Sequence, residues 1–142
     1  MALGPGESPG FLLWHATLRR QRDITAALAP LDLTHVQFVL LACTWWLNGQ
    51  GEHPHQLAVA RQAGTDVKMT SQVLRTLEQK GLVAREVDPA DARAKRLRVT
   101  DAGAELAPRA IAAVERADAD FFRPVPLGDA LALLGRLARP ED

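Results

Sequence analysis

The segment from residue 53 to residue 100 combines two short helical patterns with two β-prone stretches, and this order constrains the fold more than any other feature of the chain. The first helix is predicted from Pro54, which suits a first helical turn, to Gly64, which ends it. The second is predicted to begin after Asp66, a good N-cap, and to stop at Gly81. Two short helices joined by a glycine-containing turn form a helix-turn-helix, whose second helix is suited to the major groove of DNA.

Each predicted helix has an apolar side that must pack against the rest of the protein. In the first helix this side carries Leu57, Ala58 and Ala63, and in the second it carries Val73, Leu74 and Leu77. The opposite side of the second helix is polar and consists of Lys68, Ser71, Gln72 and Arg75. Gln72 and Arg75 are candidates for reading adenine and guanine edges, with phosphate contact or plain solvent exposure as the alternatives.

The two β-prone stretches, residues 82–87 and 96–100, enclose a charged segment, residues 88–93, that contains a proline. This pattern predicts a hairpin with a charged tip. A helix-turn-helix followed by a hairpin is a winged helix. Its wing is predicted to bring Arg93 and Lys95 within reach of a neighbouring minor groove or of phosphates.

Basic charge is concentrated in the same segment, although the whole chain has a formal net charge of zero. Residues 52–100 contain nine lysine and arginine side chains against six aspartate and glutamate side chains, a surplus of three positive charges. Residues 101–142 contain five basic and eight acidic side chains, which balances that surplus. A charged stretch is often only a solvated surface, but here it coincides with the predicted helix-turn-helix and wing.

Four further helices are predicted outside the helix-turn-helix. The first runs from Phe11 to about Ala29 and follows a glycine- and proline-rich arm, residues 1–10, which is predicted to be flexible. The next begins at His35, because Thr34 and Gln37 have the spacing of a capping box, and it ends at an Asn-Gly pair, residues 48–49. The last two cover residues 101–122 and 127–138.

The helix that begins at His35 is apolar nearly all round and is therefore predicted to be central and buried. Trp45 and Trp46 are accordingly expected to lie mostly in the core. The alternative is that they line a ligand pocket, since aromatic side chains line many pockets in helical proteins.

The chain is predicted to form one domain, because 142 residues with 47% hydrophobic content suffice for a single core. The predicted fold class is mainly α with a small β-hairpin wing. A small winged helix is complete without the terminal helices, residues 11–33 and 101–142, yet these have apolar stripes that need partners. They are therefore predicted to be dimerisation helices that pair two copies about a twofold axis.

The sequence resembles the MarR family of transcriptional regulators from Phe11 to Ala138. Four segments in the family's order carry the resemblance, namely residues 66–78, 80–83, 88–95 and 97–103. The resemblance implies a homodimer, clamped by its terminal helices, that binds a pseudo-palindromic DNA operator, with repression as the expected effect. It also implies an effector site between the dimerisation helices and the DNA-binding lobe.

Residue by residue, the resemblance assigns DNA contacts to the second helix of the motif and to the wing. On the helix the assigned residues are Lys68, Thr70, Ser71, Gln72 and Arg75. In the wing, Arg93 corresponds to the minor-groove residue and Asp91 to its positioning partner, with Lys95 as a further contact. The sequence departs from the family at His53-Pro54-His55, where a polar helix cap is more usual.

The candidate effector is a small aromatic or phenolic molecule, and its predicted pocket residues are Trp14, His15, Trp45 and Trp46. The competing interpretation of the whole chain is a winged helix that binds an acidic protein through the face from Lys68 to Arg75. In that case an arginine suited to the minor groove would be redundant at position 93.

Other classes of function receive little support from the sequence. No nucleophile, base and orienting acid form a recognisable catalytic set, so the chain is not predicted to be an enzyme or to need a cofactor. The histidines near residue 53 lack the spacing of a zinc site. The single cysteine, Cys43, rules out an internal disulfide and is predicted to be an inert thiol, with redox sensing as the alternative. The expected compartment is the cytoplasm.

Overall fold

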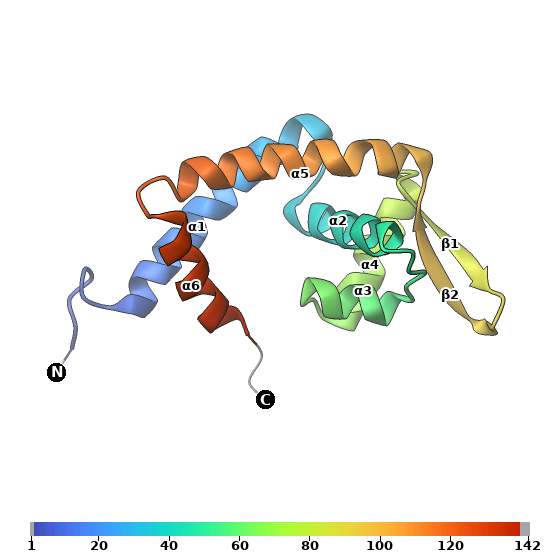
Figure 1. Ribbon diagram of the computed structural model, residues 1–142, viewed down its shortest axis with the longest axis horizontal. Coiled ribbons are helices and arrows are strands. Elements are labelled where there is room, and N and C mark those ends of the chain that lie inside the picture. The colour runs from blue at the N-terminus through green and yellow to red at the C-terminus, as the bar shows by residue number, and fades with distance from the viewer. Residues whose placement is uncertain (1, 140–142) are drawn as a thin grey trace.

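Helices dominate the computed structural model, which describes residues 2–139 (Figure 1). In chain order the elements are α1 (Pro9–Leu28), a short 3-10 helix η1 (Ala29–Leu31), α2 (His35–Gly49), α3 (Gln56–Ala63), α4 (Val67–Gln79), β1 (Val83–Asp88), β2 (Asp91–Val99), α5 (Asp101–Phe121) and α6 (Leu127–Ala138). The two strands pair antiparallel as one hairpin. The predicted fold class, mainly α with a hairpin wing, is confirmed.

Side-chain caps start the main helices where short-range sequence signals place them. Thr34 and Gln37 form the predicted capping box of α2, in which the Thr34 hydroxyl accepts from the Gln37 backbone N–H at 3.2 Å. The Asp66 carboxylate accepts from the Met69 backbone N–H at 2.8 Å and caps α4 as predicted. Ser8 caps α1, so this helix begins at Pro9, inside the segment that was predicted to be an irregular arm.

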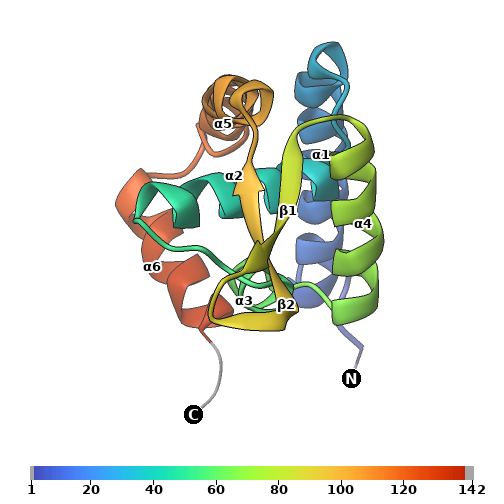
Figure 2. The same ribbon diagram turned by 90° about the vertical axis from the view of Figure 1, so that its right-hand side faces the viewer.

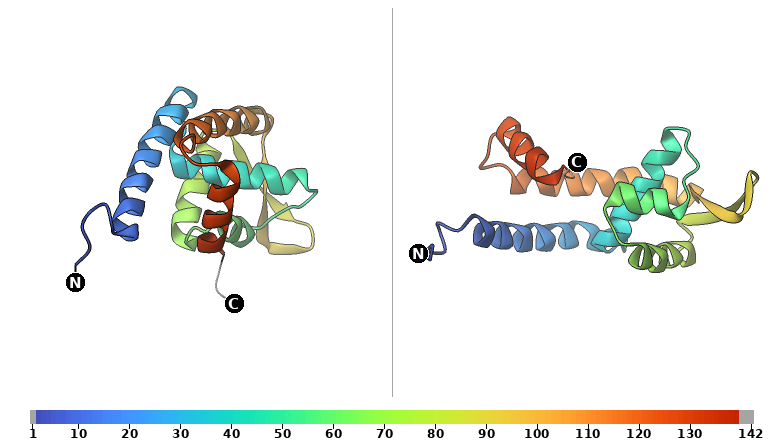
Figure 3. Two further views of the ribbon diagram at one scale, coloured as in Figure 1. Left: turned by 60° about the vertical axis from the view of Figure 1, so that its left-hand side comes forward. Right: turned by 90° about the horizontal axis from the view of Figure 1, so that it is seen from below.

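The molecule is divided into a lobe and two helical arms. Helices α2, α3 and α4 and the hairpin form the lobe at one end of the long helix α5, and α1 and α6 extend toward the other end (Figures 1 and 3). A continuous core joins the two parts, because Ile24 and Leu28 of α1 and Ala110 of α5 are buried in the same cluster as Leu41 and Leu74 of the lobe. The lobe is therefore anchored to the arms by apolar packing.

The predicted start of α3 is wrong. The helix begins at Gln56, and the buried Pro54 precedes it. The Pro54 carbonyl accepts a hydrogen bond from the Leu97 backbone N–H at 2.8 Å, so this residue belongs to the lobe's pairing with β2 rather than to a first helical turn. The inward face is also shifted, since Val59 and Ala60 are buried while Leu57 is 48% exposed and Ala58 is exposed.

Helix α2 is central but is not buried on every side. Its buried residues are Leu40, Leu41, Thr44 and Leu47. Trp45 is half-buried against the core, whereas Trp46 is 49% exposed, so the prediction that Trp46 lies in the core is wrong. No single helix among residues 2–139 has the length and hydropathy to cross a membrane; α1 with η1 and α2 meet that test only as a pair, bent by 71°.

The wing is longer than predicted, because β2 begins at Asp91 instead of Arg96. Regular pairing extends from Val83 opposite Val99 to Val87 opposite Lys95, and the next pair joins Asp88 to Asp91. Three residues, 92–94, therefore have no partner in β1, which makes an irregular tip.

Candidate nucleic-acid interface

Helix α4 presents one polar face to solvent. Lys68, Gln72 and Arg75 are exposed, and their spacing of four and three residues places them on the same side of the helix. Ser71 lies beside them and is half-buried. The opposite side is fixed by Leu74 and Leu77, which are fully buried. Packing against the core thus determines which side chains of α4 face outward. Figure 2 shows the helix itself, which runs along the right-hand edge of the view.

Thr70 does not belong to this face. Its side chain is completely buried, and its hydroxyl donates to the Asp66 carbonyl at 2.7 Å and lies 2.6 Å from the Thr65 hydroxyl. These bonds hold the turn between α3 and α4 at the start of α4. The assignment of Thr70 as a DNA contact is therefore wrong, and the residue supports the helix from within.

The wing carries Arg93 and Lys95, both exposed, on β2. The Asp91 carboxylate accepts a hydrogen bond from the Arg93 backbone N–H at 3.0 Å, which shapes the irregular tip. Asp91 can therefore position Arg93 through the backbone and leave the guanidinium free to reach outward.

The basic residues of the lobe fall into two groups. Four of them form ion pairs inside the chain, namely Lys80 with Asp32, Arg85 with Glu78, and both Arg96 and Arg98 with Glu86. Five make no ion pair within the described chain, residues 2–139, and these are Arg61, Lys68, Arg75, Arg93 and Lys95. Four of the five lie on α4 and the wing, so the unneutralised charge coincides with the two elements suited to DNA.

Asn48, at the end of α2, fastens the wing to the lobe. Its amide nitrogen donates to the Leu97 carbonyl at 3.1 Å, and its amide oxygen accepts from the Val99 backbone N–H at 2.9 Å. The sequence indicates only that an Asn-Gly pair ends the helix. A polar side chain in the last turn of an apolar helix is the one signal that could have suggested this role.

The DNA-binding residues predicted from the sequence, Thr70 excepted, thus lie on two exposed elements of one lobe. The MarR family model matches residues 33–95 of this chain. The chain is also 45% identical over 119 residues to YdcH of Bacillus subtilis strain 168, an HTH-type transcriptional regulator, covering 84% of this chain and 81% of YdcH. The chain belongs to the MarR family. It is a winged helix-turn-helix transcriptional regulator, as the sequence predicted.

Solved structures of MarR-family proteins support this membership. The repressor CouR, bound to a 23-mer DNA duplex, superposes with a TM-score of 0.80 at 30% identity, over 97% of each chain. CouR from Rhodococcus jostii RHA1 bound to p-coumaroyl-CoA gives a TM-score of 0.81 at 25% identity, over 96% of this chain and 93% of CouR. Rv2887 of Mycobacterium tuberculosis in complex with salicylic acid gives a TM-score of 0.66 at 30% identity, over 92% of this chain and 93% of Rv2887.

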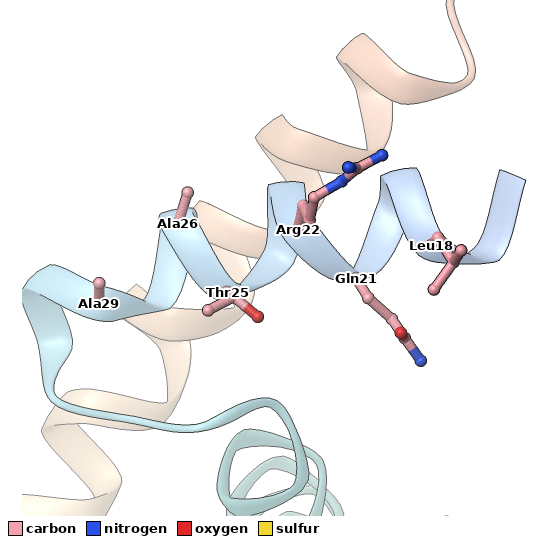
Figure 4. Close-up of a pocket in the computed structure, with 6 residues that line it drawn as sticks. All are labelled: Leu18, Gln21, Arg22, Thr25, Ala26 and Ala29. Atoms are coloured by element: carbon pink, nitrogen blue, oxygen red, sulfur yellow. The ribbon is translucent and has the colours of Figure 1, made fainter. Parts of the chain in front are cut away.

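Two of the hollows beside α1 are candidate effector sites in this MarR-family chain. One, of about 440 Å³, is lined by six residues from Leu18 to Ala29, so its wall comes from one side of the molecule and a second surface is needed to enclose it (Figure 4). The other, of about 230 Å³, lies among α1, α2, α5 and α6. Its lining residues are Leu13, Ala16, Thr17, Arg20, Gln21, His35, Phe121, Phe122 and Leu134.

The predicted effector residues do not line either hollow. Trp14 is 61% exposed on α1, and the exposed His15 packs edge to face against Phe11. Trp45 and Trp46 lie near the end of α2, and the smaller hollow takes only His35 from that helix. The structure therefore does not bring these four residues together as one pocket.

Two polar side chains in the wall of the smaller hollow are Arg20, which is held by an ion pair behind the wall, and His35, whose imidazole is neutral. The Arg20 guanidinium binds the Asp118 carboxylate through two hydrogen bonds of 2.9 and 3.2 Å. Desolvation by burial lowers the pKa of His35; the Arg20 charge lowers it further, and Asp118 partly offsets this. His35 is therefore neutral at pH 7 and can either donate or accept a hydrogen bond.

Cys43 is half-buried against the core, and this burial raises the pKa of its thiol. A raised pKa keeps the thiol protonated at neutral pH, and the thiolate is the reactive form. This environment supports the prediction of an inert cysteine.

Proposed function

We propose that a homodimer of this chain binds a pseudo-palindromic operator and represses transcription, with α4 in the major groove and the wing at the minor groove. The observation that carries the proposal is that the basic side chains of the lobe divide into ion-paired and unpaired groups, and that most of the unpaired group lies on α4 and the wing. Lys68, Arg75, Arg93 and Lys95 are exposed and form no ion pair with any residue from 2 to 139, whereas Arg85, Arg96 and Arg98 are neutralised by carboxylates. CouR, a repressor of the same fold, is bound to a DNA duplex in its solved structure.

The dimer in this proposal is supported by apolar surface on the two arms. On α1 the exposed large apolar residues are Phe11, Leu12, Leu13, Trp14 and Leu18, and on or beside α6 they are Val125, Leu127, Leu131, Leu133, Leu134 and Leu137. Such a surface is more than a monomer normally leaves in water. A second copy related by a twofold axis would cover it and would set the spacing of the two α4 helices.

Each side chain has a distinct role in the proposal. Gln72 and Arg75 read base edges from the exposed face of α4, and Ser71 makes a shorter contact beside them. Lys68 and Lys95 bind phosphates. Arg93 enters the minor groove, where Asp91 positions it through the backbone. No catalytic step is involved, and the proposed compartment is the cytoplasm.

The effector in this proposal is a small aromatic acid that occupies the hollow among α1, α2, α5 and α6. Phe121, Phe122 and Leu134 offer it apolar walls, and His35 offers one polar group. The ligands in the related structures are salicylic acid in Rv2887 and p-coumaroyl-CoA in CouR. A ligand among these helices would alter how the lobe sits on the arms, and so the distance between the two α4 helices.

Selection of bound duplexes from a random DNA pool tests the proposed function. We expect the full-length protein to enrich a palindromic site at low salt, and we expect salicylate to reduce binding to that site. Absence of enrichment at low salt, where electrostatic binding is strongest, would contradict DNA binding and favour the protein-binding alternative. Enrichment of a non-palindromic site would contradict binding as a symmetric dimer.

Replacing Lys68 or Lys95 by alanine is expected to weaken binding to all DNA sequences alike and to flatten its salt dependence. Each phosphate contact contributes about 0.9 to the slope of log K against log salt, so loss from both protomers removes roughly two units. Fluorescence anisotropy over a salt series measures the slope. Arg116→Ala, which removes an exposed arginine of α5, is the matched control and should leave the slope unchanged. An unchanged slope in Lys68→Ala and Lys95→Ala would argue against phosphate contact.

A further inference from the structure

The segment between α2 and α3 pairs with the wing strand β2 and contains His55, whose side chain does not cap α3. The Leu97 backbone N–H donates to the Pro54 carbonyl at 2.8 Å, and His55 forms an isolated antiparallel bridge with Arg96. His55 occupies the N-cap position of α3, yet its side chain makes no capping hydrogen bond there. Its backbone therefore belongs to the lobe, while its imidazole is free to bond elsewhere.

The imidazole of His55 bonds to the end of the first wing strand. Its Nε2 atom lies 2.6 Å from Oδ2 of Asp88, and 43% of the histidine side chain and 19% of the aspartate side chain are exposed. The other carboxylate oxygen, Oδ1, accepts from the Ala90 backbone N–H at 2.9 Å. One carboxylate thus joins the lobe to the turn at the tip of the wing.

Asp88 occupies the point where regular pairing of the hairpin stops. Residues 92–94 have no partner in β1, so the ladder does not fix the position of Arg93. Two carboxylates hold this part of the tip. Asp88 accepts a hydrogen bond from the Ala90 backbone N–H, and Asp91 accepts one from the Arg93 backbone N–H. Of these two, Asp88 is the one bonded to a residue outside the wing.

We propose that His55 is a positioning residue for the wing and that its bond to Asp88 determines where Arg93 meets DNA. This inference rests on the proposed function, in which Arg93 contacts the minor groove. His55 itself need not touch DNA. A wing that is not tied to α3 would sample more orientations, and ordering it on binding would cost affinity.

The carboxylate of this pair is an ionised acceptor. The Ala90 N–H and the His55 imidazole lower the pKa of Asp88, so its carboxylate is ionised at neutral pH. Hydrogen bonds to an ionised group are stronger than bonds between two neutral groups. The bond between His55 and Asp88 is therefore suited to hold the tip of the wing in place.

Other charged groups around the pair need matching controls. Arg96 on β2 and Glu86 on β1 are near neighbours that form an ion pair with each other. His53 and Arg61 line the same shallow hollow as His55 and Asp88. His53 is the important control, because it lines the same hollow but makes no side-chain hydrogen bond within the described residues, 2–139.

A double-mutant cycle with Arg93 tests the proposal. We expect His55→Ala to weaken operator binding about tenfold in the wild-type protein, the scale of one hydrogen bond to a charged group, and less than about twofold in an Arg93→Ala background. His55→Gln, whose amide can still donate to Asp88, should keep most of the affinity. His53→Ala should behave like the wild type.

The outcomes separate this inference from the function on which it rests. Equal loss from His55→Ala in both backgrounds, or full affinity in His55→Ala while Arg93→Ala binds weakly, would overturn the positioning role only. Full affinity in Arg93→Ala would overturn the wing contact itself. Amide hydrogen exchange across residues 88–95 provides a second measurement, because faster exchange in folded His55→Ala or Asp88→Asn supports the tie and unchanged exchange in both contradicts it.

Discussion

Replacing Arg93 by glutamine is expected to weaken binding of the dimer to its operator by about a hundredfold or more. The Arg93 side chain is exposed and forms no ion pair within the described residues, 2–139, so its removal should cost the isolated fold little. A hydrogen bond to a charged group contributes about 1.5 to 3 kcal/mol, and each protomer would lose one, which corresponds to at least about 3 kcal/mol in all. Anisotropy titration with the selected duplex measures the loss.

Arg98 provides the matched control, because it lies on the same strand and is also exposed. Its guanidinium bonds to Glu86 at 2.6 Å, so it is already neutralised within the protein. Arg98→Gln should therefore change operator affinity by less than about threefold, the scale of an exposed ion pair. An Arg93→Gln protein with normal thermal unfolding and full affinity would exclude the minor-groove role.

Where a helix start or end is determined by neighbouring residues, the sequence predicted it correctly. The capping box at Thr34 and the cap at Asp66 involve bonds over three residues, and both are present in the structure. Gly64 and Gly81 end α3 and α4 with positive φ angles of 72° and 74°, a conformation that glycine adopts without a steric penalty. Because these devices are local, the sequence contains all the information that specifies them.

The predictions that failed depend on distant parts of the chain. Pro54 pairs with Leu97 on the wing, and no local signal distinguishes this from a first helical turn. Thr70 is completely buried because the fold packs this side of α4 against the lobe, and its hydroxyl is satisfied there by the Asp66 carbonyl. Trp46 is 49% exposed because the rest of the fold packs against the other side of α2, where Leu40, Leu41, Thr44 and Leu47 are buried.

In the candidate site too, the residues set by local patterns were predicted and those set by long-range contacts were not. Lys68, Gln72 and Arg75 follow from helical periodicity, and Arg93 follows from its place in the wing motif. The residues that hold the wing, Asn48 and His55, could not be found in this way. Asn48 bonds to residues 49 and 51 positions further on, and His55 bonds to a residue 33 positions further on. Such pairs become visible only when the fold brings them together.

Alanine at position 103 is expected to destabilise the protein by about 3 kcal/mol or more. A Cβ atom there would lie 2.0 Å from the Leu82 carbonyl oxygen, far inside any real contact. That carbonyl cannot easily move, since it accepts from the Thr100 backbone N–H at 3.1 Å, and the Leu82 N–H donates to Leu77 at 3.0 Å. The strain of overpacking typically costs about 1 to 3 kcal/mol, and a clash with fixed backbone belongs at or above that limit.

The predicted change in Gly103→Ala should appear as a fall in melting temperature of roughly 10 °C, measured by calorimetry. Gly49→Ala is the matched control, because it also replaces a helical glycine and its Cβ would meet nothing within 4 Å. Helix propensity favours alanine by up to about 1 kcal/mol, so the control should be neutral or slightly stabilised, and the same gain cannot offset the clash at position 103. Wild-type stability in Gly103→Ala would contradict the close packing of α5 on Leu82.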